Sequence, residues 1–534
     1  MKSQSIILGL MPLLAIARVP TNSSFTNSAD FVASGTRACN QIASVYPNDV
    51  FWPQSDTFRS ESTGMSTHTS LESIIPITDN YHIAIYSDTC IFSPSCVFEP
   101  SNAASLGSAV KIIKAARSRF AVRAGGHMPV PGAQSVQSGV MVSLSKLHSR
   151  SLNGDKTIAS IGPGQVWADV YTWLAPEGLA VNGGRYGTVG VGGLLVGGGI
   201  SYFSSTKGWS CDTIVGYEVV LADGSVVEAR ADGRYADLFW ALHGGHNNFG
   251  IVTRFDLKTF PITSAYIGGA AWDGRDPSFE TQFFSAFDSY MAPGGGVDDP
   301  NVAISAILGL TPSNGIKQLT SLQFAPGTDA SPRAFENFTA LRAPIIQGLP
   351  NAVLPSWTAL PILLEQLGER GSRQLYSSVS FYPDPRAIRI ANETVVELAV
   401  PVLSRISNSS IALTYQPVSK DWLIASKASG NNVLDLDPEL GTFIAGLVTI
   451  TWTDAADDVI INDLIERITR TIELRTRALG LYYPFIYLND ASPSQKPFRT
   501  YGGGRNLPKL RAIRAKYDPD RFLEYYLGHG FSLE

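Results

Sequence analysis

The sequence predicts an α+β fold in which more than one domain is built from a single long chain. Short β-runs separated by glycine turns fill residues 139–256, and an Asp-Gly turn at 223–224 joins two of them into a hairpin. Over residues 261–479 the apolar segments are longer, and strand patterns alternate with amphipathic helices. With 534 residues, 44% of them hydrophobic, the chain can bury a large core.

Individual elements follow from local periodicity. Residues 18 to about 70 are polar and contribute few periodic hydrophobics. Beyond them, short strands are expected at 96–100, 120–123 and 139–144, and helices at 105–118, 167–175 and 236–242. In 105–118 the apolar face carries Leu106, Val110 and Ile113. The clearest helix is 459–479, which Gly480 is expected to end and which repeats Ile460, Leu464, Ile468 and Ile472.

The first seventeen residues have the pattern of a secretory signal peptide. Lys2 precedes an apolar run over 6–17, and Ala-Ile-Ala at 15–17 offers a small-x-small cleavage site. A short buried helix at a domain edge is the alternative. Four N-x-S/T sequons are possible glycosylation sites, at Asn22, Asn337, Asn392 and Asn408. We therefore expect a secreted protein, or one in the lumen of the secretory pathway.

Charge and motif content exclude several function classes. The formal net charge is −5 and the 41 Lys and Arg residues are scattered, so nucleic acid is not an expected partner. No segment after the leader has the ~20 uninterrupted apolar residues of a membrane span. There is no G-x-S-x-G of a serine hydrolase and no P-loop. His243 and His246 lack the further ligands of a metal site, so no metal is expected.

Three glycine clusters carry the main chemical signal. They span 123–127, 187–199 and 244–250, each beside β-type segments. Glycine allows a backbone to approach a ligand closely and allows successive N–H groups to converge on an anion such as a pyrophosphate. Tight turns without a ligand are the alternative for any one cluster. The Rossmann fingerprint is absent, because Leu195 stands where its third glycine belongs.

In this order the motifs resemble those of the FAD-linked oxidoreductases of the vanillyl-alcohol-oxidase class, in the branch similar to berberine bridge enzyme. The matching segments are Arg-Ala-Gly-Gly-His at 123–127, Val-Gly-Val-Gly-Gly at 189–193, and Asn-Asn-Phe-Gly-Ile-Val-Thr at 247–253. In the tail, Tyr-Leu-Asn-Asp-Ala at 487–491 is similar to the Tyr-x-Asn-Tyr element of that branch, and Tyr-Asp-Pro at 517–519 is similar to its closing helix. The likeness covers about 92–262 and 480–534 and is weaker between them.

The resemblance implies a two-part, PCMH-type FAD-binding domain, a separate α/β substrate domain, and a C-terminal segment that returns to the FAD domain. The corresponding boundaries are 1–17 for the signal peptide, 18–91 for an N-terminal segment, 92–262 for the FAD domain, 263–479 for the substrate domain and 480–534 for the C-terminal segment. Residues 71–95 depart from the family pattern, and 82–90 have the character of an insertion.

The same resemblance implies that His127 bonds covalently to the 8α-methyl group of FAD. Neutral imidazole is a good nucleophile, which suits this chemistry; a turn histidine that only hydrogen-bonds is the alternative. Single attachment is expected, since no cysteine occurs at 184–188. By family likeness Cys39 and Cys96 form a disulfide, and Cys211 is expected to be a buried thiol. The residues expected to bind FAD are Arg123, Ala124, Gly125, Gly126, His127, Met128, Thr188, Val189, Gly190, Gly192, Gly193, Gly198, Gly250, Ile251 and Val252.

For the reaction, the resemblance implies an oxidase that acts on CH–OH and passes electrons to O2, giving H2O2. Tyr487, Asn489 and Asp490 are the catalytic candidates, and Asp490 stands where many members have a tyrosine. Tyr487 as a plain aromatic wall is the alternative for that residue.

The expected substrate is a small hydrophobic secondary metabolite, by class a polyketide-derived alcohol. This expectation is what the resemblance implies. The middle domain supplies aromatics, among them Trp357, Phe381 and Tyr382, and has no charge cluster to bind an ionic substrate. Some relatives add a Diels–Alder cyclisation of the product. A carbohydrate oxidase of the same fold and a non-catalytic flavin-binding protein are the rival functions.

Overall fold

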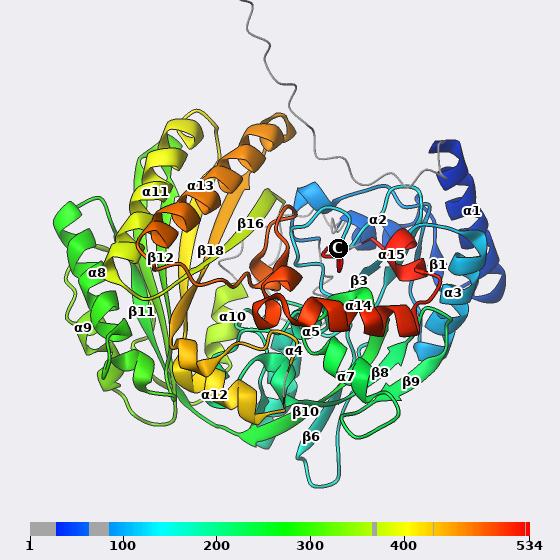
Figure 1. Ribbon diagram of the computed structural model, residues 1–534, viewed down its shortest axis with the longest axis horizontal. Helices are drawn as coiled ribbons and strands as arrows, with labels where there is room; N and C mark the ends of the chain where they lie inside the picture. Colours follow the sequence, from blue (N-terminus) through cyan, green and yellow to red (C-terminus); the bar gives the residue numbers. More distant parts are fainter. Residues whose placement is uncertain (1–27, 64–84, 366–370, 431, 529) are drawn as a thin grey trace, which may run out of the picture.

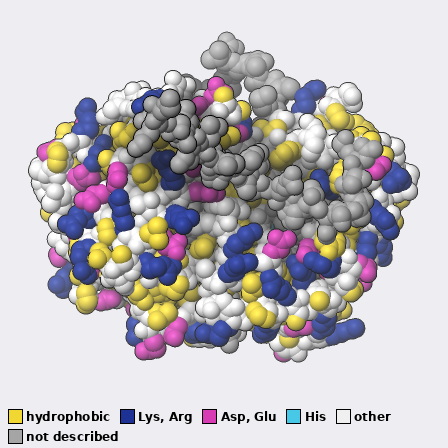
Figure 2. Space-filling model, turned by 45° about the horizontal axis from the view of Figure 1, so that its top comes forward, with side chains coloured by type: hydrophobic (Ala, Val, Ile, Leu, Met, Phe, Trp, Pro, Cys, Tyr) yellow, Lys and Arg dark blue, Asp and Glu magenta, His cyan; other side chains and the backbone are white. Residues whose placement is uncertain are grey.

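The computed structural model describes residues 28–63, 85–365, 371–430, 432–528 and 530–534. The expected signal peptide and the Asn22 sequon lie outside these ranges. Within the described residues the chain forms three sheets with helices around them, so the predicted α+β class is confirmed (Figure 1). No helix in these ranges is long and apolar enough to cross a membrane. On the face in Figure 2, acidic and basic side chains are interspersed.

The first sheet carries the first glycine cluster at the end of one of its strands. Its order is β1-β2-β4-β3, and β4 pairs in parallel with both β2 and β3. The strands are β1 (Val50–Phe51), β2 (Cys96–Phe98), β3 (Phe120–Arg123) and β4 (Val140–Ser143). The packed helices are α1 (Ser28–Val45), α2 (Asp56–Thr63) and α3 (Ala103–Ala116), whose predicted face of Leu106, Val110 and Ile113 is buried.

Helices α1 and α2 show that the polar N-terminal stretch contributes more structure than its sequence suggested. In α1, Ala38, Cys39 and Ile42 are fully buried against the first sheet. Cys39 forms the predicted disulfide with Cys96 of β2, and Cys211 is a buried free thiol as expected. The helix lies in a stretch rich in Ser, Thr and Asn, which is why this stretch was interpreted as polar.

The second sheet completes the first half of the molecule. Its order is β5-β6-β10-β8-β9, with β7 paired to β10. The strands are β5 (Arg150–Leu152), β6 (Ile158–Ile161), β7 (Leu179–Val181), β8 (Ile214–Val220), β9 (Val226–Ala229) and β10 (Ile251–Pro261). The β8–β9 turn contains Gly224 at φ +75°, a left-handed conformation that favours glycine. The helices here are α4 (Trp167–Leu174), α5 (Val191–Val196), α6 (Ser204–Lys207) and α7 (Ala236–Leu242).

The third sheet is antiparallel throughout, with order β14-β11-β13-β12-β17-β18-β16 and β15 paired to β11. Its strands are β11 (Ala265–Asp273), β12 (Ala303–Thr311), β13 (Ile316–Pro326), β14 (Ile345–Gly348), β15 (Ala352–Leu354), β16 (Arg373–Phe381), β17 (Ser410–Val418) and β18 (Phe443–Trp452). Helices α8 (Pro277–Met291), α9 (Glu336–Thr339), α11 (Pro385–Leu403) and α13 (Asp458–Ala478) lie over one face (Figure 1). The remaining helices of this region are α10 (Ala359–Glu365) and α12 (Lys420–Ala428).

Packing under these helices follows the two periodicities of strand and helix. Alternate residues such as Leu413 and Val448 point beneath α11 and α13 and are buried. The predicted helix 459–479 is confirmed as α13, but Ile460 is 46% exposed. Ile461 and Ile465 lie on the buried face instead, because the row of buried apolar residues begins one residue later than predicted.

Two sequons of the folded region are exposed and one is not. Asn337 and Asn408 are exposed. Asn392 is 8% exposed, and its Oδ1 accepts a hydrogen bond of 2.6 Å from the Tyr415 hydroxyl. A glycan needs an exposed asparagine, so Asn392 is excluded as a glycosylation site in the folded protein.

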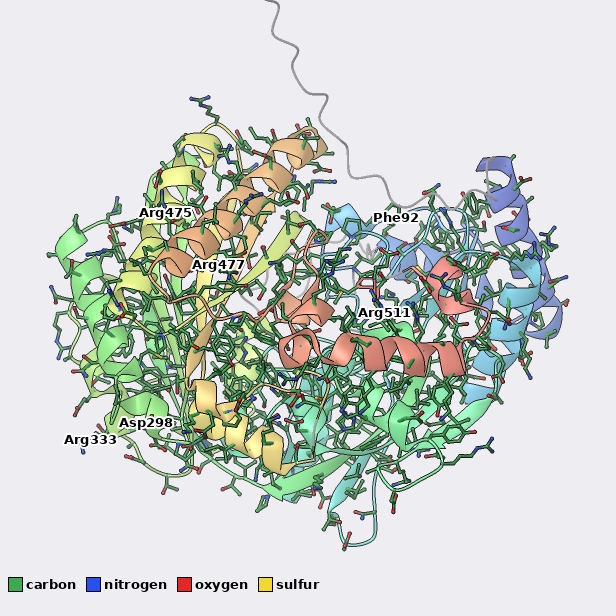
Figure 3. The ribbon with its side chains drawn as sticks, viewed as in Figure 1. Phe92, Asp298, Arg333, Arg475, Arg477 and Arg511 are labelled. Atoms are coloured by element: carbon green, nitrogen blue, oxygen red, sulfur yellow. A yellow bond between two sulfur atoms is a disulfide. The ribbon has the colours of Figure 1, made fainter. Side chains whose placement is uncertain are left out.

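The C-terminal residues pack back onto the first half of the molecule. The Gly528 N–H donates to the Phe120 carbonyl at 2.7 Å, and Leu527 pairs with Phe120 as a parallel bridge. These contacts follow α14 (Asn506–Tyr517) and α15 (Phe522–Tyr526). Arg511 of α14 donates to the Leu533 carbonyl at 2.6 Å, which ties down the last residues (Figure 3).

Candidate active site

A large cleft lies between the glycine loops of the first half and the third sheet. Its volume is about 1490 Å³, above the ~300–1,000 Å³ of typical small-molecule pockets. One wall comes from residues 122–128, 144–196 and 246–255, and the other from strands of the third sheet. Tyr487, Asn489 and Asp490 of the C-terminal segment also line it. The cleft therefore has room for a dinucleotide and a substrate together.

Two glycine loops cross so closely that neither tolerates a side chain at the crossing. A Cβ added to Gly125 would lie 2.3 Å from the Gly190 Cα, and one added to Gly190 would lie 2.4 Å from the Gly125 Cα. Next to the crossing, Gly126 has φ +65°, which favours glycine and turns the chain into His127. By contrast, a Cβ at Gly193 would meet nothing within 4 Å. The loops thus form a bare backbone cradle at the cleft, which suits the pyrophosphate of a dinucleotide.

The structure brings nearly all of the expected cofactor residues to this cleft. Arg123 and Gly198 are the exceptions. Gly198 faces Leu434 and Trp209 behind the lining. The residues that line the cleft are Ala124, Gly125, Gly126, His127, Met128, Thr188, Val189, Gly190, Gly192, Gly193, Gly250, Ile251 and Val252.

Arg123 is placed behind the cleft by a buried ion pair with Glu61 of α2. Both residues are nearly inaccessible, at 1% and 5% exposure. Arg123 Nη2 also donates to Ser143 Oγ at 3.0 Å, and burial lowers the pKa of its guanidinium to about 10. The side chain therefore joins α2 to the first sheet instead of facing a ligand in the cleft.

His127 is half-buried and its ring is stacked on Tyr86. The two ring centroids are 4.0 Å apart with an interplanar angle of 15°. Tyr86 is held by its own N–H, which donates to the Gly126 carbonyl at 3.0 Å, and its ring contacts Tyr376 of β16 edge-on at 6.0 Å. Tyr86 belongs to the segment 71–95, whose role the sequence left open. Residues 71–84 of that segment lie outside the described ranges.

Tyr487 and Asn489 join the two halves of the molecule at the cleft. The Tyr487 hydroxyl oxygen accepts from Gly199 N–H at 3.1 Å and from Asn489 Nδ2 at 2.9 Å. The Tyr487 N–H donates to Ser378 Oγ of β16 at 3.1 Å. Burial raises the pKa of the Tyr487 phenol well above its usual value. Tyr487 therefore remains protonated near neutral pH and is a poor candidate for a base.

Asp490 has the properties of a general base. It is almost fully buried, and its Oδ2 accepts a hydrogen bond of 2.7 Å from Gln416 Nε2 of β17. Burial raises the pKa of the carboxyl to about 6, while the Gln416 hydrogen bond and the charge of Arg185 oppose that rise. A carboxylate with a pKa near the operating pH is well matched to proton abstraction.

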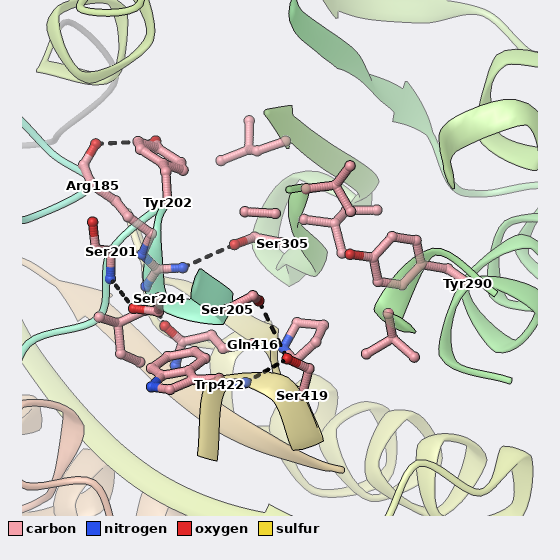
Figure 4. Close-up of a pocket in the computed structure, with 17 residues that line it drawn as sticks. Arg185, Ser201, Tyr202, Ser204, Ser205, Tyr290, Ser305, Gln416, Ser419 and Trp422 are labelled. Atoms are coloured by element: carbon pink, nitrogen blue, oxygen red, sulfur yellow. Dashed lines mark hydrogen bonds between the residues drawn. The ribbon is translucent and has the colours of Figure 1, made fainter. Parts of the chain in front are cut away.

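Arg185 and Gln416 form a relay that fixes the orientation of this carboxylate. Arg185 Nη2 donates to Gln416 Oε1, and Arg185 Nη1 donates to Ser305 Oγ at 3.0 Å (Figure 4). Since Gln416 Oε1 is the acceptor, its amide nitrogen must face Asp490. A second cavity of about 30 Å³, sufficient for a water molecule, lies behind Arg185 and Gln416 among serines including Ser201 and Ser419.

The middle-domain aromatics Trp357, Phe381 and Tyr382 do not line the cleft. Trp357 is buried against Tyr171 and Phe203, with ring centroids 4.5 and 5.3 Å away. Phe381 is buried beneath the helices of the third sheet, and Tyr382 packs outside the cleft lining. Large aromatic rings are buried where they can exclude most water. The sequence also missed Tyr86, Arg185 and Gln416, whose spacing along the chain gives no signal.

Comparison with known proteins agrees with this site. A family model described as an FAD binding domain matches residues 94–230. The FAD-dependent monooxygenase prx3 of Penicillium roqueforti is 36% identical over 512 residues, which cover 93% of each chain. The bifunctional solanapyrone synthase of Alternaria solani is 30% identical over 425 residues, which cover 79% of this chain and 78% of that one.

Among solved structures, the glucooligosaccharide oxidase of Acremonium strictum, described with a 6-S-cysteinyl, 8α-N1-histidyl FAD, shares the fold with a TM-score of 0.70 and 17% identity. That alignment covers 91% of this chain and 97% of the oxidase. The fold and the extended sequence identity together confirm the resemblance seen in the motifs. The chain belongs to the FAD-linked oxidoreductases of the vanillyl-alcohol-oxidase class, in the branch similar to berberine bridge enzyme.

Proposed function

We propose that this FAD-dependent oxidoreductase is an oxidase that converts a CH–OH group of a small, uncharged secondary metabolite, polyketide-derived, into a carbonyl. In the balanced reaction, one alcohol and one O2 give one carbonyl compound and one H2O2, so the carbon loses the two electrons that O2 gains. The observation that carries the proposal is Asp490, a buried carboxylate held by Gln416 in the same cleft as the glycine cradle. A non-catalytic flavin-binding protein has no need for an ionisable group held in this way.

Asp490 takes the proton of the substrate hydroxyl. Its Oδ2 is occupied by Gln416, so Oδ1 is the oxygen that receives the proton. Arg185 stabilises the ionised carboxylate through its charge. When bound, FAD supplies the two-electron oxidation of the C–H bond and returns the electrons to O2. Tyr487, whose hydroxyl oxygen is held by Asn489, forms a rigid wall that keeps the substrate in position.

We further propose that His127 holds FAD by a single covalent bond. His127 lies at the glycine cradle, half-buried and stacked on Tyr86, so its ring has one fixed orientation. The 8α-N1-histidyl linkage in the name of the glucooligosaccharide oxidase structure supports this assignment. Residues 184–188 contain no cysteine, which is consistent with one bond instead of two.

We also propose that the protein passes through the secretory pathway. Residues 1–17 have the signal-peptide pattern. The disulfide between Cys39 and Cys96 is of a kind that persists in oxidising compartments. Secretion from a host that cleaves the leader, measured by the N-terminal sequence of the mature protein, checks this part.

The experiment is to denature the purified protein in acid and measure whether flavin fluorescence stays with the polypeptide. Wild type should retain it, and His127→Ala should release it. His148→Ala is the matched control, because this histidine lies at the same cleft but is exposed. Consumption of O2 with an equal yield of H2O2 then tests the oxidase. Release of flavin by wild type would refute the covalent bond, and absence of any alcohol-driven flavin reduction would refute the oxidase.

A further inference from the structure

The third sheet presents one uncharged face to the cleft. Lining positions follow the period of two along each strand, for example Thr414 and Ala412 in β17 and Leu447 and Thr449 in β18. The intervening residues are buried beneath α11 and α13 on the opposite face (Figure 1). Among the described residues, no lining residue between 303 and 452 is charged. This wall therefore offers no partner to a carboxylate or an ammonium group.

The strand register groups the lining residues into three rows across the sheet, which we call levels. The first level lies beside Gln416, the residue that is hydrogen-bonded to Asp490. Each level is two residues further along β17, so levels are about 7 Å apart and the third is about 20 Å from Gln416. The levels follow the cross-strand pairs of β12, β16, β17 and β18. The first level is Ile307, Thr414 and Leu447, the second is Ala412, Thr449 and Tyr376, and the third is Ser410, Thr451 and Gln374.

Polarity rises with distance from Asp490. At the first level, two aliphatic side chains flank the single hydroxyl of Thr414. At the second level, hydroxyl groups come from Thr449 and Tyr376, beside one methyl group. At the third level every lining side chain is polar. Thr451 there is only 9% exposed, so a water-covered rim does not account for its polarity.

Four hydroxyl groups of this wall are free to bind a ligand, whereas that of Tyr376 is hydrogen-bonded to Tyr86. Within the described part of the chain, the side chains of Ser410, Thr414, Thr449 and Thr451 make no hydrogen bond. In the core, by contrast, the Thr469 hydroxyl donates to the Ile465 carbonyl at 2.8 Å. Three of the four, Ser410, Thr414 and Thr449, are only partly buried, so these hydroxyl groups face the open cleft, where they can hydrogen-bond to a ligand.

We infer that this face is a graded substrate channel, and that the substrate is an uncharged amphiphile with hydrocarbon around the oxidised carbon and hydroxyl or carbonyl groups toward its far end. The inference rests on the proposed function, since it takes Asp490 as the reacting end. It replaces the purely hydrophobic substrate expected from the sequence. It also differs from a sugar, in which hydroxyl groups flank the oxidised carbon on the adjoining atoms.

The test measures ligand affinity on the flavin-loaded enzyme without O2, from the change in the visible flavin spectrum. The probes are decanol, decanediol with a hydroxyl at each end, and hydroxydecanoate with a carboxylate at the far end. Decanediol should bind most tightly and hydroxydecanoate least. Thr449→Val should weaken decanediol binding by about two- to twelve-fold, the effect of one hydrogen bond, and leave decanol unchanged.

Thr311→Val is the matched control, because Thr311 lies in β12 of the same sheet but outside the cleft lining, and it should change neither affinity. Equal binding of hydroxydecanoate and decanediol, or equal effects of the two substitutions, would overturn the channel. Tighter binding of cellobiose than of decanediol would overturn the apolar first level. If the proposed function is wrong and the channel is right, the expected order of affinities will hold but no bound alcohol will reduce the flavin.

Discussion

Replacing Gln416 by Leu should move the pH dependence of flavin reduction. The amide of Gln416 donates to ionised Asp490 at 2.7 Å and favours the charged form. A hydrogen bond to a charged group contributes about 1.5–3 kcal/mol. Since 1.36 kcal/mol corresponds to one pKa unit, its loss should raise the pKa of Asp490 from about 6 by roughly one to two units.

The rate of flavin reduction should fall at low pH, because the proposed base is the carboxylate of Asp490. A base must be ionised, so the rate of flavin reduction by an excess of a reactive alcohol should fall tenfold per pH unit below the pKa. Wild type should lose rate below about pH 6, and Gln416→Leu below roughly pH 7–8, with recovery at higher pH. Anaerobic stopped-flow measurements give both profiles. Gln318→Leu removes an amide from the same wall without contact to Asp490 and should keep the wild-type profile. An equal loss of rate at every pH in Gln416→Leu would refute the argument.

Three further substitutions test the architecture around the site. Glu61→Ala leaves the guanidinium of Arg123 buried without its carboxylate, so the free energy of unfolding should fall by about 3–5 kcal/mol in denaturant titrations. Gly125→Ala inserts a methyl group into the backbone of the second glycine loop and should lower the flavin bound per chain, whereas Gly154→Ala, which meets nothing within 4 Å, should not. Opening the disulfide with Cys39→Ser removes a cross-link over 57 residues and should cost about 4 kcal/mol, seen as a lower Tm than wild type under oxidising conditions.

Local features of the fold were predictable because they are encoded locally. The strand at 120–123, the helix at 236–242 and the crowding of glycines at 187–199 each follow from a short stretch of sequence. His127 was singled out by the resemblance of its turn to a family motif, and it lines the cleft. Helix α1 was missed because its buried residues Ala38, Cys39 and Ile42 lie in a stretch that is otherwise rich in Ser, Thr and Asn.

The proton-handling part of the site was only partly predictable. Asp490 was identified from a tail motif, but Arg185 and Gln416 are separated by 231 residues and converge only in the fold. Their relay depends on the register that places Gln416 of β17 beside the C-terminal segment. The aromatic residues Trp357, Phe381 and Tyr382 lie outside the cleft lining. Trp357 carries so much apolar surface that the core is its most favourable place.

In the proposed function, the two walls of the cleft bind the cofactor and the substrate by different means. The cofactor wall depends on backbone, since Gly125 and Gly190 admit no side chain, so few substitutions are tolerated there. The substrate wall depends on side chains at alternate positions of β17 and β18, such as Thr414 and Thr449, while the intervening residues maintain the core. Lining residues can therefore change without disturbing either the sheet packing or the cofactor cradle. We expect substrate preference to be altered most readily by substitutions of the even positions of β17 and the odd positions of β18.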